Sequence, residues 1–579
     1  MNSVLARLVF LSIVCACVVN CFALDREAFT VTKYDLNIRI DPPQQRLEGR
    51  GKITLRNDSA TFQKIAVLQI TSTLAWRSIR SGDKPLQFVL QSFTSDIDHT
   101  GALSEAIVTL PQAVAPKGTV DLDIGYEGVV ALDATRLTRI ATPDDAARSS
   151  DWDQISAKFT AVRGAGYVAW YPIATEAASL SEGNDLFEVL ARWKARETVA
   201  TMHLQVAVAS GDEDEKPELV LNATECPTAH ETGGQFVADC TYRALGIILP
   251  TLVVANYEVV KCPEVEVHFL PGHNSAATSY ADAAEKVVPF ITEWFGAPRS
   301  KAETADLQDG GAAPFESGSL LLAPLTGIDP KLAGLTAAHQ LTHAAFSSPR
   351  PWINEGLAHF AQALYLEHER GRAAALDYIG LHTSSFSAVE NEKEKQLVPP
   401  QPKAEANRSL INTADEQLYR SKAMCVWWML RDMLGDAALK KALAAYRPEQ
   451  DNEPSYMQRL IQAQTQRDLE WFFDDWVYRD RGLPDFKIAS AFTRQTLPVG
   501  YMVTVTVANL GTAGAEVPLT VKFEGGEVVR RLVVRGKSNG VIRVEVPKLP
   551  EEVVVNDGSV PESDVTNNVF KIEAGDVAK

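Results

Sequence analysis

The sequence predicts a multidomain α+β protein with a β-rich N-terminal region, a mainly helical middle region and a C-terminal β-sandwich. At 579 residues the chain is too long for a single hydrophobic core. Apolar and polar residues alternate near both ends, whereas segments rich in Ala, Leu and Glu fill the middle. We expect an N-terminal domain over residues 24–262, a middle domain over 263–484 and a C-terminal domain over 485–579.

The N-terminal domain is expected to be antiparallel β. Tyr34, Leu36, Ile38 and Ile40 alternate with polar residues, and Pro42-Pro43 then ends the run. A similar alternation over Val265–Phe269 leaves open which domain that last strand joins. Period-two alternation between Pro, Gly and Asn clusters is typical of antiparallel sheets with one buried face.

The middle domain is expected to be mainly helical. The predicted helices cover residues 279–295, 331–346, 352–371, 415–434 and 454–478. Strands return after Pro484, where Val503, Val505 and Val507 alternate, and Glu524–Glu527 contains a Gly-Gly hairpin turn. Short strands over about 95 residues favour an immunoglobulin-like sandwich.

Charge and hydropathy restrict the possible partners. The formal net charge of -18 argues against nucleic acid, because phosphate binding needs a basic surface. After the N-terminus, no apolar run approaches the ~20 residues that a membrane helix needs. The sequence gives no indication of oligomeric state.

The N-terminus is expected to be a secretory signal peptide over residues 1–23. Arg7 precedes an apolar run over Leu8–Val19, and cleavage is expected after Ala23. The alternative is a lipoprotein acylated at Cys17, and either would export the protein to the periplasm or the exterior. Export favours disulfides, and we expect one between Cys226 and Cys240, with two buried free thiols as the alternative.

Two histidines, His339 and His343, stand four residues apart and therefore lie on one face of a helix, one turn apart. This spacing lets two imidazoles bind one zinc ion. Glu355 begins the next helical segment. The eleven residues between His343 and Glu355 are long enough for the chain to turn and place Glu355 beside the two histidines. Three ligands of these types leave a fourth position on zinc open to water.

Gln340 directly follows the first histidine, where a catalytic site of this kind needs a carboxylate. A neutral amide cannot accept a proton from metal-bound water. General acid–base catalysis contributes about 10²–10⁴-fold to rate, so hydrolysis by such a site would be slow. The sequence therefore predicts a zinc site that lacks its general base.

These motifs resemble the gluzincin zinc metallopeptidases, especially the aminopeptidase N and leukotriene hydrolase family. His339–His343 is similar to the family HExxH motif, and Asn354–Ala358 to its Asn-Glu-Gly-Phe-Ala motif. The resemblance implies a thermolysin-like catalytic domain that binds one zinc ion through His339, His343 and Glu355.

Two further sites follow from the same resemblance. Glu316, in Gly311–Ser317, would bind the free amine of a substrate, although the Met and Asn of the family's Gly-x-Met-Glu-Asn motif are absent. Tyr419, in Tyr-Arg-Ser-Lys, would stabilise the oxyanion of the transition state, with one extra residue before Ser-Lys compared with the family. His359, four residues after Glu355, is a substitute ligand, a partner behind the ligands or an uninvolved histidine.

The leading hypothesis is an exported, aminopeptidase-like zinc protein that acts on peptides or proteins, with hydrolysis impaired by Gln340. The alternative is a pseudo-peptidase that binds peptides or protein partners without turnover. A zinc hydrolase for another substrate, such as an ester, is a third hypothesis.

Overall fold

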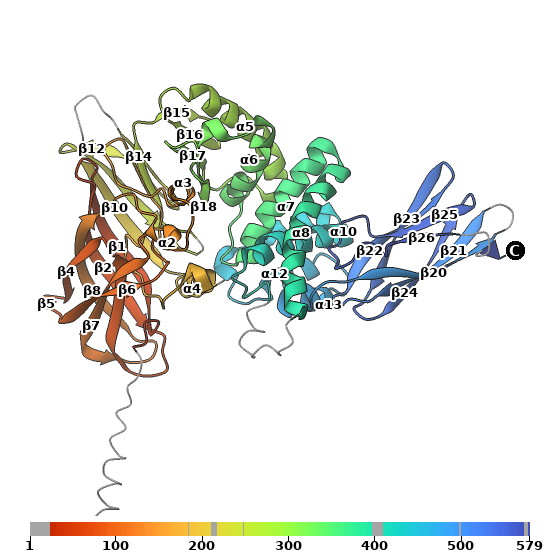
Figure 1. Cartoon of the computed structure of the whole chain (residues 1–579), viewed down its shortest axis with the longest axis horizontal. Helices are drawn as coiled ribbons and strands as arrows, with labels where there is room; N and C mark the ends of the chain where they lie inside the picture. The colour runs from red at the N-terminus through yellow and green to blue at the C-terminus, as the bar shows by residue number, and fades with distance from the viewer. Residues whose placement is uncertain are drawn as a thin grey trace, which may run out of the picture.

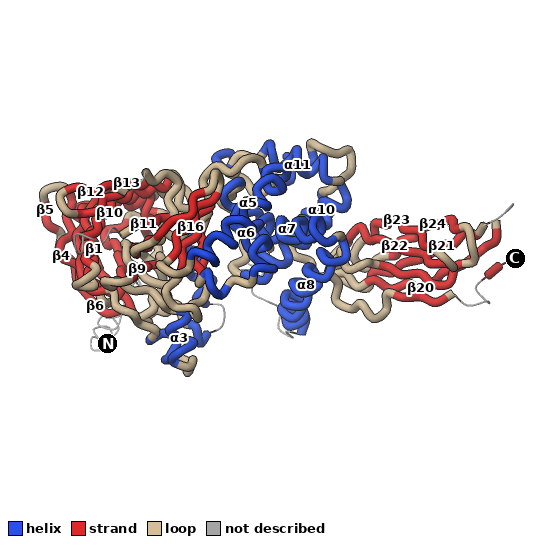
Figure 2. The backbone as a smooth tube through the Cα atoms, turned by 90° about the horizontal axis from the view of Figure 1, so that it is seen from above, coloured by secondary structure: helices blue, strands red, loops and turns tan. Residues whose placement is uncertain are grey.

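The computed structural model describes residues 24–182, 185–209, 217–227, 229–246, 248–395, 409–496, 500–572 and 577–578. The predicted signal peptide and Cys17 lie outside the described residues. Three regions follow one another along the molecule: β-rich, helical and β-rich (Figures 1 and 2). No helix in the described ranges is long and apolar enough to cross a membrane.

The N-terminal region is built on an eight-stranded sheet in the order β12-β13-β10-β1-β2-β8-β4-β5. Two three-stranded sheets, β3-β7-β6 and β11-β14-β9, accompany it. The strands are β1 Phe29–Asp41, β2 Arg46–Asn57, β3 Gln63–Thr71, β4 Leu74–Ser81, β5 Lys84–Pro85, β6 Phe88–Thr94, β7 Ala102–Val114, β8 Thr119–Val129, β9 Phe159–Val162, β10 Thr201–Ala209, β11 Glu218–Leu221, β12 His230–Thr232, β13 Gln235–Tyr242 and β14 Leu252–Ala255. Three helices join them: α2 Thr135–Thr138, α3 Asp144–Ser150 and α4 Asp185–Arg196.

In this region the structure contradicts one prediction, on strand direction, and confirms another, on a disulfide. Strands β1 and β10 run parallel, so the expectation of a purely antiparallel domain was wrong. Their connection spans the other strands and helices of the region, and side-chain alternation does not reveal direction. The predicted disulfide between Cys226 and Cys240 is present and ties the segment before β12 to β13.

The middle region begins with a five-stranded mixed sheet in the order β15-β16-β17-β19-β18. Its strands are β15 Glu258–Lys261, β16 Val265–Phe269, β17 Ala302–Asp306, β18 Phe315–Ser317 and β19 Leu320–Ala323. β15 pairs with β16, so residues 258–261, which we expected in the N-terminal domain, lie in this sheet. β18 forms one edge.

Helices make up the rest of the middle region. They are α5 Asn274–Phe295, α6 Pro330–Ala345, α7 Pro351–Arg370, α8 Arg372–Lys395, α10 Ala423–Leu434, α11 Asp436–Ala445, α12 Tyr456–Gln462 and α13 Glu470–Phe473, with π-helices over Gln417–Lys422 and Asp474–Tyr478. The predicted helix over 415–434 is continuous from residue 416, with its π-helical stretch Gln417–Lys422 running directly into α10, whereas the predicted helix 454–478 is broken into shorter pieces. Helices α8 and α11 were not predicted.

The C-terminal region consists of two four-stranded sheets, β24-β21-β20-β27 and β23-β22-β25-β26. The strands are β20 Phe486–Gln495, β21 Tyr501–Asn509, β22 Ala515–Phe523, β23 Gly526–Val534, β24 Asn539–Val546, β25 Pro550–Val555, β26 Val569–Lys571 and β27 Val577–Ala578. Val503, Val505 and Val507 are fully buried, as their alternation predicts. Gly525, with φ of 84°, lies in the turn between β22 and β23.

The N-terminal region holds the edge strand β18 in place. The Trp152 indole donates a hydrogen bond to the Ala313 carbonyl (3.0 Å), and the Ala313 amide donates to the Ser149 carbonyl (2.7 Å). The guanidinium of Arg163 lies 3.8 Å from the Trp152 ring centroid and 5.4 Å from that of Phe315. The position of β18 therefore depends on contacts between two regions.

Arg163 forms a fully buried ion pair with Asp153. Its Nη2 lies 2.6 Å from a carboxylate oxygen of Asp153, and Nη2 also donates to the Ser150 carbonyl at 2.7 Å. The side chains are 2% and 0% exposed. Removing one partner of such a pair leaves an uncompensated buried charge.

We predict that Arg163→Met lowers the free energy of unfolding of the N-terminal region by about 3–5 kcal/mol, measured by urea denaturation followed by tryptophan fluorescence. Arg148→Met is the control, because Arg148 pairs with Asp144 on the surface at 2.8 Å and should contribute less than about 1 kcal/mol. Equal effects from the two substitutions would contradict the structural role of the buried pair.

Candidate metal centre

Helices α6 and α7 bring the predicted ligands together. Pro330 occupies the first turn of α6, and the Asp329 side chain accepts a hydrogen bond from the Lys331 amide, which caps the helix. α7 likewise begins at Pro351. The two helices pack directly against each other.

The ligating atoms lie at the separations that a single ion requires. His339 Nε2 and His343 Nε2 are 3.2 Å apart. One oxygen of Glu355 lies 3.5 Å from His343 Nε2, and its other oxygen lies 3.8 Å from His339 Nε2. With zinc–ligand bonds of about 2.0–2.1 Å, the edges of a tetrahedron are roughly 3.3–3.4 Å. The three side chains therefore converge at spacings close to those of ligands on one zinc ion.

Burial keeps the histidines in the form that binds metal. Burial, followed by the neighbouring His359 and His343, lowers the pKa of His339 well below its ordinary value. Burial also lowers the pKa of His343. Burial alone would raise the pKa of Glu355, but His343 and Arg420 hold it below its ordinary value. Neutral imidazoles beside an ionised carboxylate are the protonation states that zinc coordination needs.

Asn354 and Gly356 flank the glutamate, and each has a distinct role. Asn354 Nδ2 lies 3.1 Å from His343 Nδ1, and Asn354 Oδ1 accepts from the Ser348 amide at 3.1 Å. These contacts orient the His343 ring so that Nε2 faces the cluster. A Cβ at Gly356 would lie 2.7 Å from that of Ala423, so only glycine lets α10 approach α7 this closely.

Gln340 is 1% exposed, and every hydrogen-bonding position of its amide is used. Its Nε2 donates to the carbonyls of Glu303 (2.7 Å) and Ser319 (3.0 Å). Its Oε1 accepts from the hydroxyls of Tyr280 (2.8 Å) and Thr304 (3.2 Å). This residue therefore ties α6 to α5, to β17 and to the turn before β19.

Glu316 lies on the edge strand β18, beside the histidines. Its Oε2 is 3.4 Å from His339 Nε2, and its ligating atom lies within 4.8 Å of those of His339 and His343. Burial, followed by the charge of Glu355, raises the pKa of Glu316 well above its ordinary value. The structure thus brings Glu316, which the sequence motif singled out, beside the two histidines.

Tyr419 lies near the cluster, because Glu416 and Glu355 are among the charges that add to the raising of its pKa by burial. Its hydroxyl donates to Glu416 at 3.2 Å. The next residue, Arg420, also reaches the cluster, with Nε 3.5 Å from Glu355 and Nη1 3.1 Å from Glu416.

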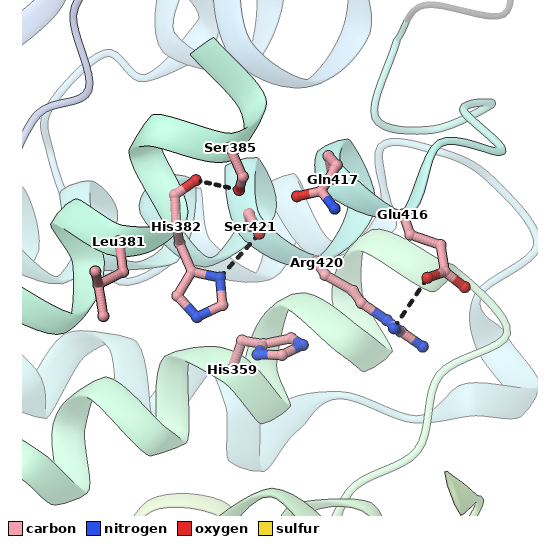
Figure 3. Close-up of a pocket in the computed structure, with 8 residues that line it drawn as sticks. All are labelled: His359, Leu381, His382, Ser385, Glu416, Gln417, Arg420 and Ser421. Atoms are coloured by element: carbon pink, nitrogen blue, oxygen red, sulfur yellow. Dashed lines mark hydrogen bonds and ion pairs between the residues drawn. The ribbon is translucent and has the colours of Figure 1, made fainter. Parts of the chain in front are cut away.

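A cavity of about 340 Å³ lies next to the cluster. Figure 3 shows that His359, His382 and Arg420 surround it, with Glu416 paired to Arg420. His359 also packs edge-on against His339, with ring centroids 4.7 Å apart. Burial lowers the pKa of Lys194 on α4, and the charges of Glu416 and Glu355 act against this shift. Sequence reasoning identified neither Arg420 nor Lys194.

No protein-family model and no curated protein matches the chain. Among solved structures it is similar to an M1 zinc metallopeptidase from Deinococcus radiodurans, with a TM-score of 0.49 and 17% sequence identity. That match covers 78% of this chain and 94% of the other. A mutant of that enzyme bound to a Tyr-Ser-Ala substrate gives a TM-score of 0.45 and 18% identity, over 79% of this chain and 96% of the other.

We predict that Gln340→Glu destabilises the metal-free protein by about 2–5 kcal/mol at neutral pH, because a carboxylate would face two carbonyl oxygens that have lost their donors. Burial raises the pKa of the introduced carboxyl above its unfolded value, so the loss relative to wild type should shrink as the pH falls toward 4.

Thermal unfolding at several pH values measures this effect. Gln112→Glu is the control, because Gln112 lies exposed on β7, far along the chain from the metal ligands. A Gln340→Glu protein as stable as wild type at neutral pH would contradict the role of the Gln340 amide in joining α6 to α5 and to the sheet.

Proposed function

We propose that this protein is an exported, aminopeptidase-like zinc protein that binds peptides and hydrolyses them slowly. The observation that carries the proposal is the convergence of His339 Nε2, His343 Nε2 and the Glu355 carboxylate within 3.2–3.8 Å of one another. Zinc bound there would polarise a substrate carbonyl and lower the pKa of a bound water to about 7. The resemblance of the sequence motifs to the gluzincins supports a peptide as the substrate.

The other side chains supply the rest of the site. Glu316 would bind the free amine at the start of the peptide, because its carboxylate lies beside the histidines on an edge strand. Arg420, 3.5 Å from Glu355, and the neighbouring Tyr419 hydroxyl are the donors that would face a developing oxyanion. The residue at position 340 accepts no proton, which removes about 10²–10⁴-fold in rate.

A second candidate is a pseudo-peptidase that binds peptides without turnover. The hydrogen bonds of Gln340 favour it, because all four hydrogen-bonding positions of the amide are used by α5, β17 and the turn before β19. In this alternative the metal and the cleft are retained as a peptide-binding surface. Both candidates share the metal site and differ only in turnover.

We predict that the purified protein binds one zinc ion and that His343→Gln weakens binding by at least about 100-fold, because a ligand contributes more than the 10–100-fold typical of groups behind the ligands. Metal content after dialysis and competition with a chelator measure this. His368→Gln is the control, because His368 lies on α7, as Glu355 does, but its side chain is 62% exposed.

Hydrolysis of a panel of aminoacyl, peptide and ester substrates separates the candidates. Turnover that a chelator abolishes and that N-terminal acetylation of the peptide prevents supports the slow aminopeptidase. Binding of free-amine peptides without turnover supports the pseudo-peptidase, and turnover of esters alone contradicts both. Failure to bind zinc at all overturns the proposed function.

A further inference from the structure

Two carboxylates, not one, approach the same histidine. Glu316 Oε2 lies 3.4 Å from His339 Nε2, and Glu355 Oε2 lies 3.8 Å from it. The Glu316–His339 separation matches the edge of roughly 3.3–3.4 Å expected between two ligands of one tetrahedral zinc ion. Glu316 therefore lies at ligand distance, closer than a group that only contacts a substrate would need to be.

The charges at this point call for a cation. Glu316 and Glu355 are both shielded from water, with side chains 23% and 15% exposed. Two like charges that share one partner repel each other at short range. Arg420 lies 3.5 Å from Glu355, and Oε1 of Glu316 is buried without a hydrogen-bond partner among the described residues. A divalent ion bound by both carboxylates would favour the ionised form of Glu316 and balance both charges.

The backbone holds Glu316 in this position. In strand β18, Glu316 is paired with Leu321 of β19. On the next residue, the Ser317 hydroxyl accepts from the Leu249 amide at 2.9 Å, and Asn222 donates to the Ser317 carbonyl at 3.3 Å. The carboxylate thus extends from a strand fixed on both sides, which is a suitable support for a metal ligand.

We propose that Glu316 is a fourth protein ligand of the ion held by His339, His343 and Glu355, and that it closes the coordination sphere at rest. This inference depends on the metal site of the proposed function. Four protein ligands leave no position for water, as in structural zinc sites. A peptide with a positively charged amino terminus competes for the same carboxylate, so such peptides are the ligands that open the site.

His359 is the other candidate for the fourth position. Its ligating atom lies within 4.8 Å of those of His339 and Glu355. The ligating atom of Glu316 lies within 4.8 Å of those of both His339 and His343, whereas His359 groups with His339 and Glu355. Glu316 Oε2 also approaches His339 Nε2 to 3.4 Å, which makes Glu316 the better fourth ligand.

The test replaces zinc by Co²⁺ and records the visible absorption spectrum from pH 6 to 9. A metal-bound water ionises near pH 7, so a site with an open position changes its spectrum over this range. We expect a spectrum independent of pH for wild type and a pH-dependent one for Glu316→Gln. We also expect zinc affinity to fall by at least about 100-fold in Glu316→Gln.

His359→Gln is the matched control, because it removes another side chain that packs against His339 and should leave the spectrum unchanged. Adding a free-amine tripeptide to wild-type Co²⁺ protein should alter the spectrum, and its N-acetylated form should not. If Glu316→Gln does not fold, Glu316→Asp, which has a shorter reach, is expected to give the same pH-dependent spectrum.

Three results would overturn the inference. The first is a wild-type spectrum that titrates near neutrality and is unaltered in the Glu316 variant. The second is an effect of His359→Gln in place of Glu316→Gln, which would assign the fourth position to the histidine. Absence of metal binding in wild type would overturn the proposed function and this inference together, whereas the first two leave the metal site intact.

Discussion

The site depends on how helix α6 is fixed against the sheet below it. His339 and Gln340 are consecutive and therefore point about 100° apart around the helix, so one faces α7 while the other faces β17 and β19. The four hydrogen bonds of Gln340 fix the rotation of the helix about its axis. That rotation decides where both imidazoles point, so the amide sets the geometry of a cluster that it does not touch.

The second constraint is electrostatic. Three neutral histidines, two carboxylates and one guanidinium share a volume with little solvent, and the region beyond Arg420 contains Glu416 and Lys194. In such surroundings each ion depends on its neighbours for compensation, because water contributes little. The same arrangement that favours a divalent cation makes the site costly to keep without one.

The sequence predicted those parts of the molecule that depend on local spacing. Spacing along the chain predicts that His339 and His343 share a helix face and that Glu355 can reach them. The period-two alternation of the valines in the C-terminal region likewise predicts their burial. Strand direction did not follow, since β1 and β10 pair in parallel across a long connection. The role of Gln340 was also missed, because its partners Tyr280, Glu303 and Ser319 lie 21 to 60 residues away and no local pattern connects them.

The π-helix over Gln417–Lys422 has a broader implication. A π-turn accommodates an additional residue without changing the direction of the helix that follows it. Here α10, which follows the π-helix, packs on α7. The guanidinium of Arg420 lies near Glu355, and the hydroxyl of Tyr419 donates to Glu416. The i→i+5 winding of this segment changes the angle between successive side chains, so the π-helix decides which of Tyr419 and Arg420 faces the ligands.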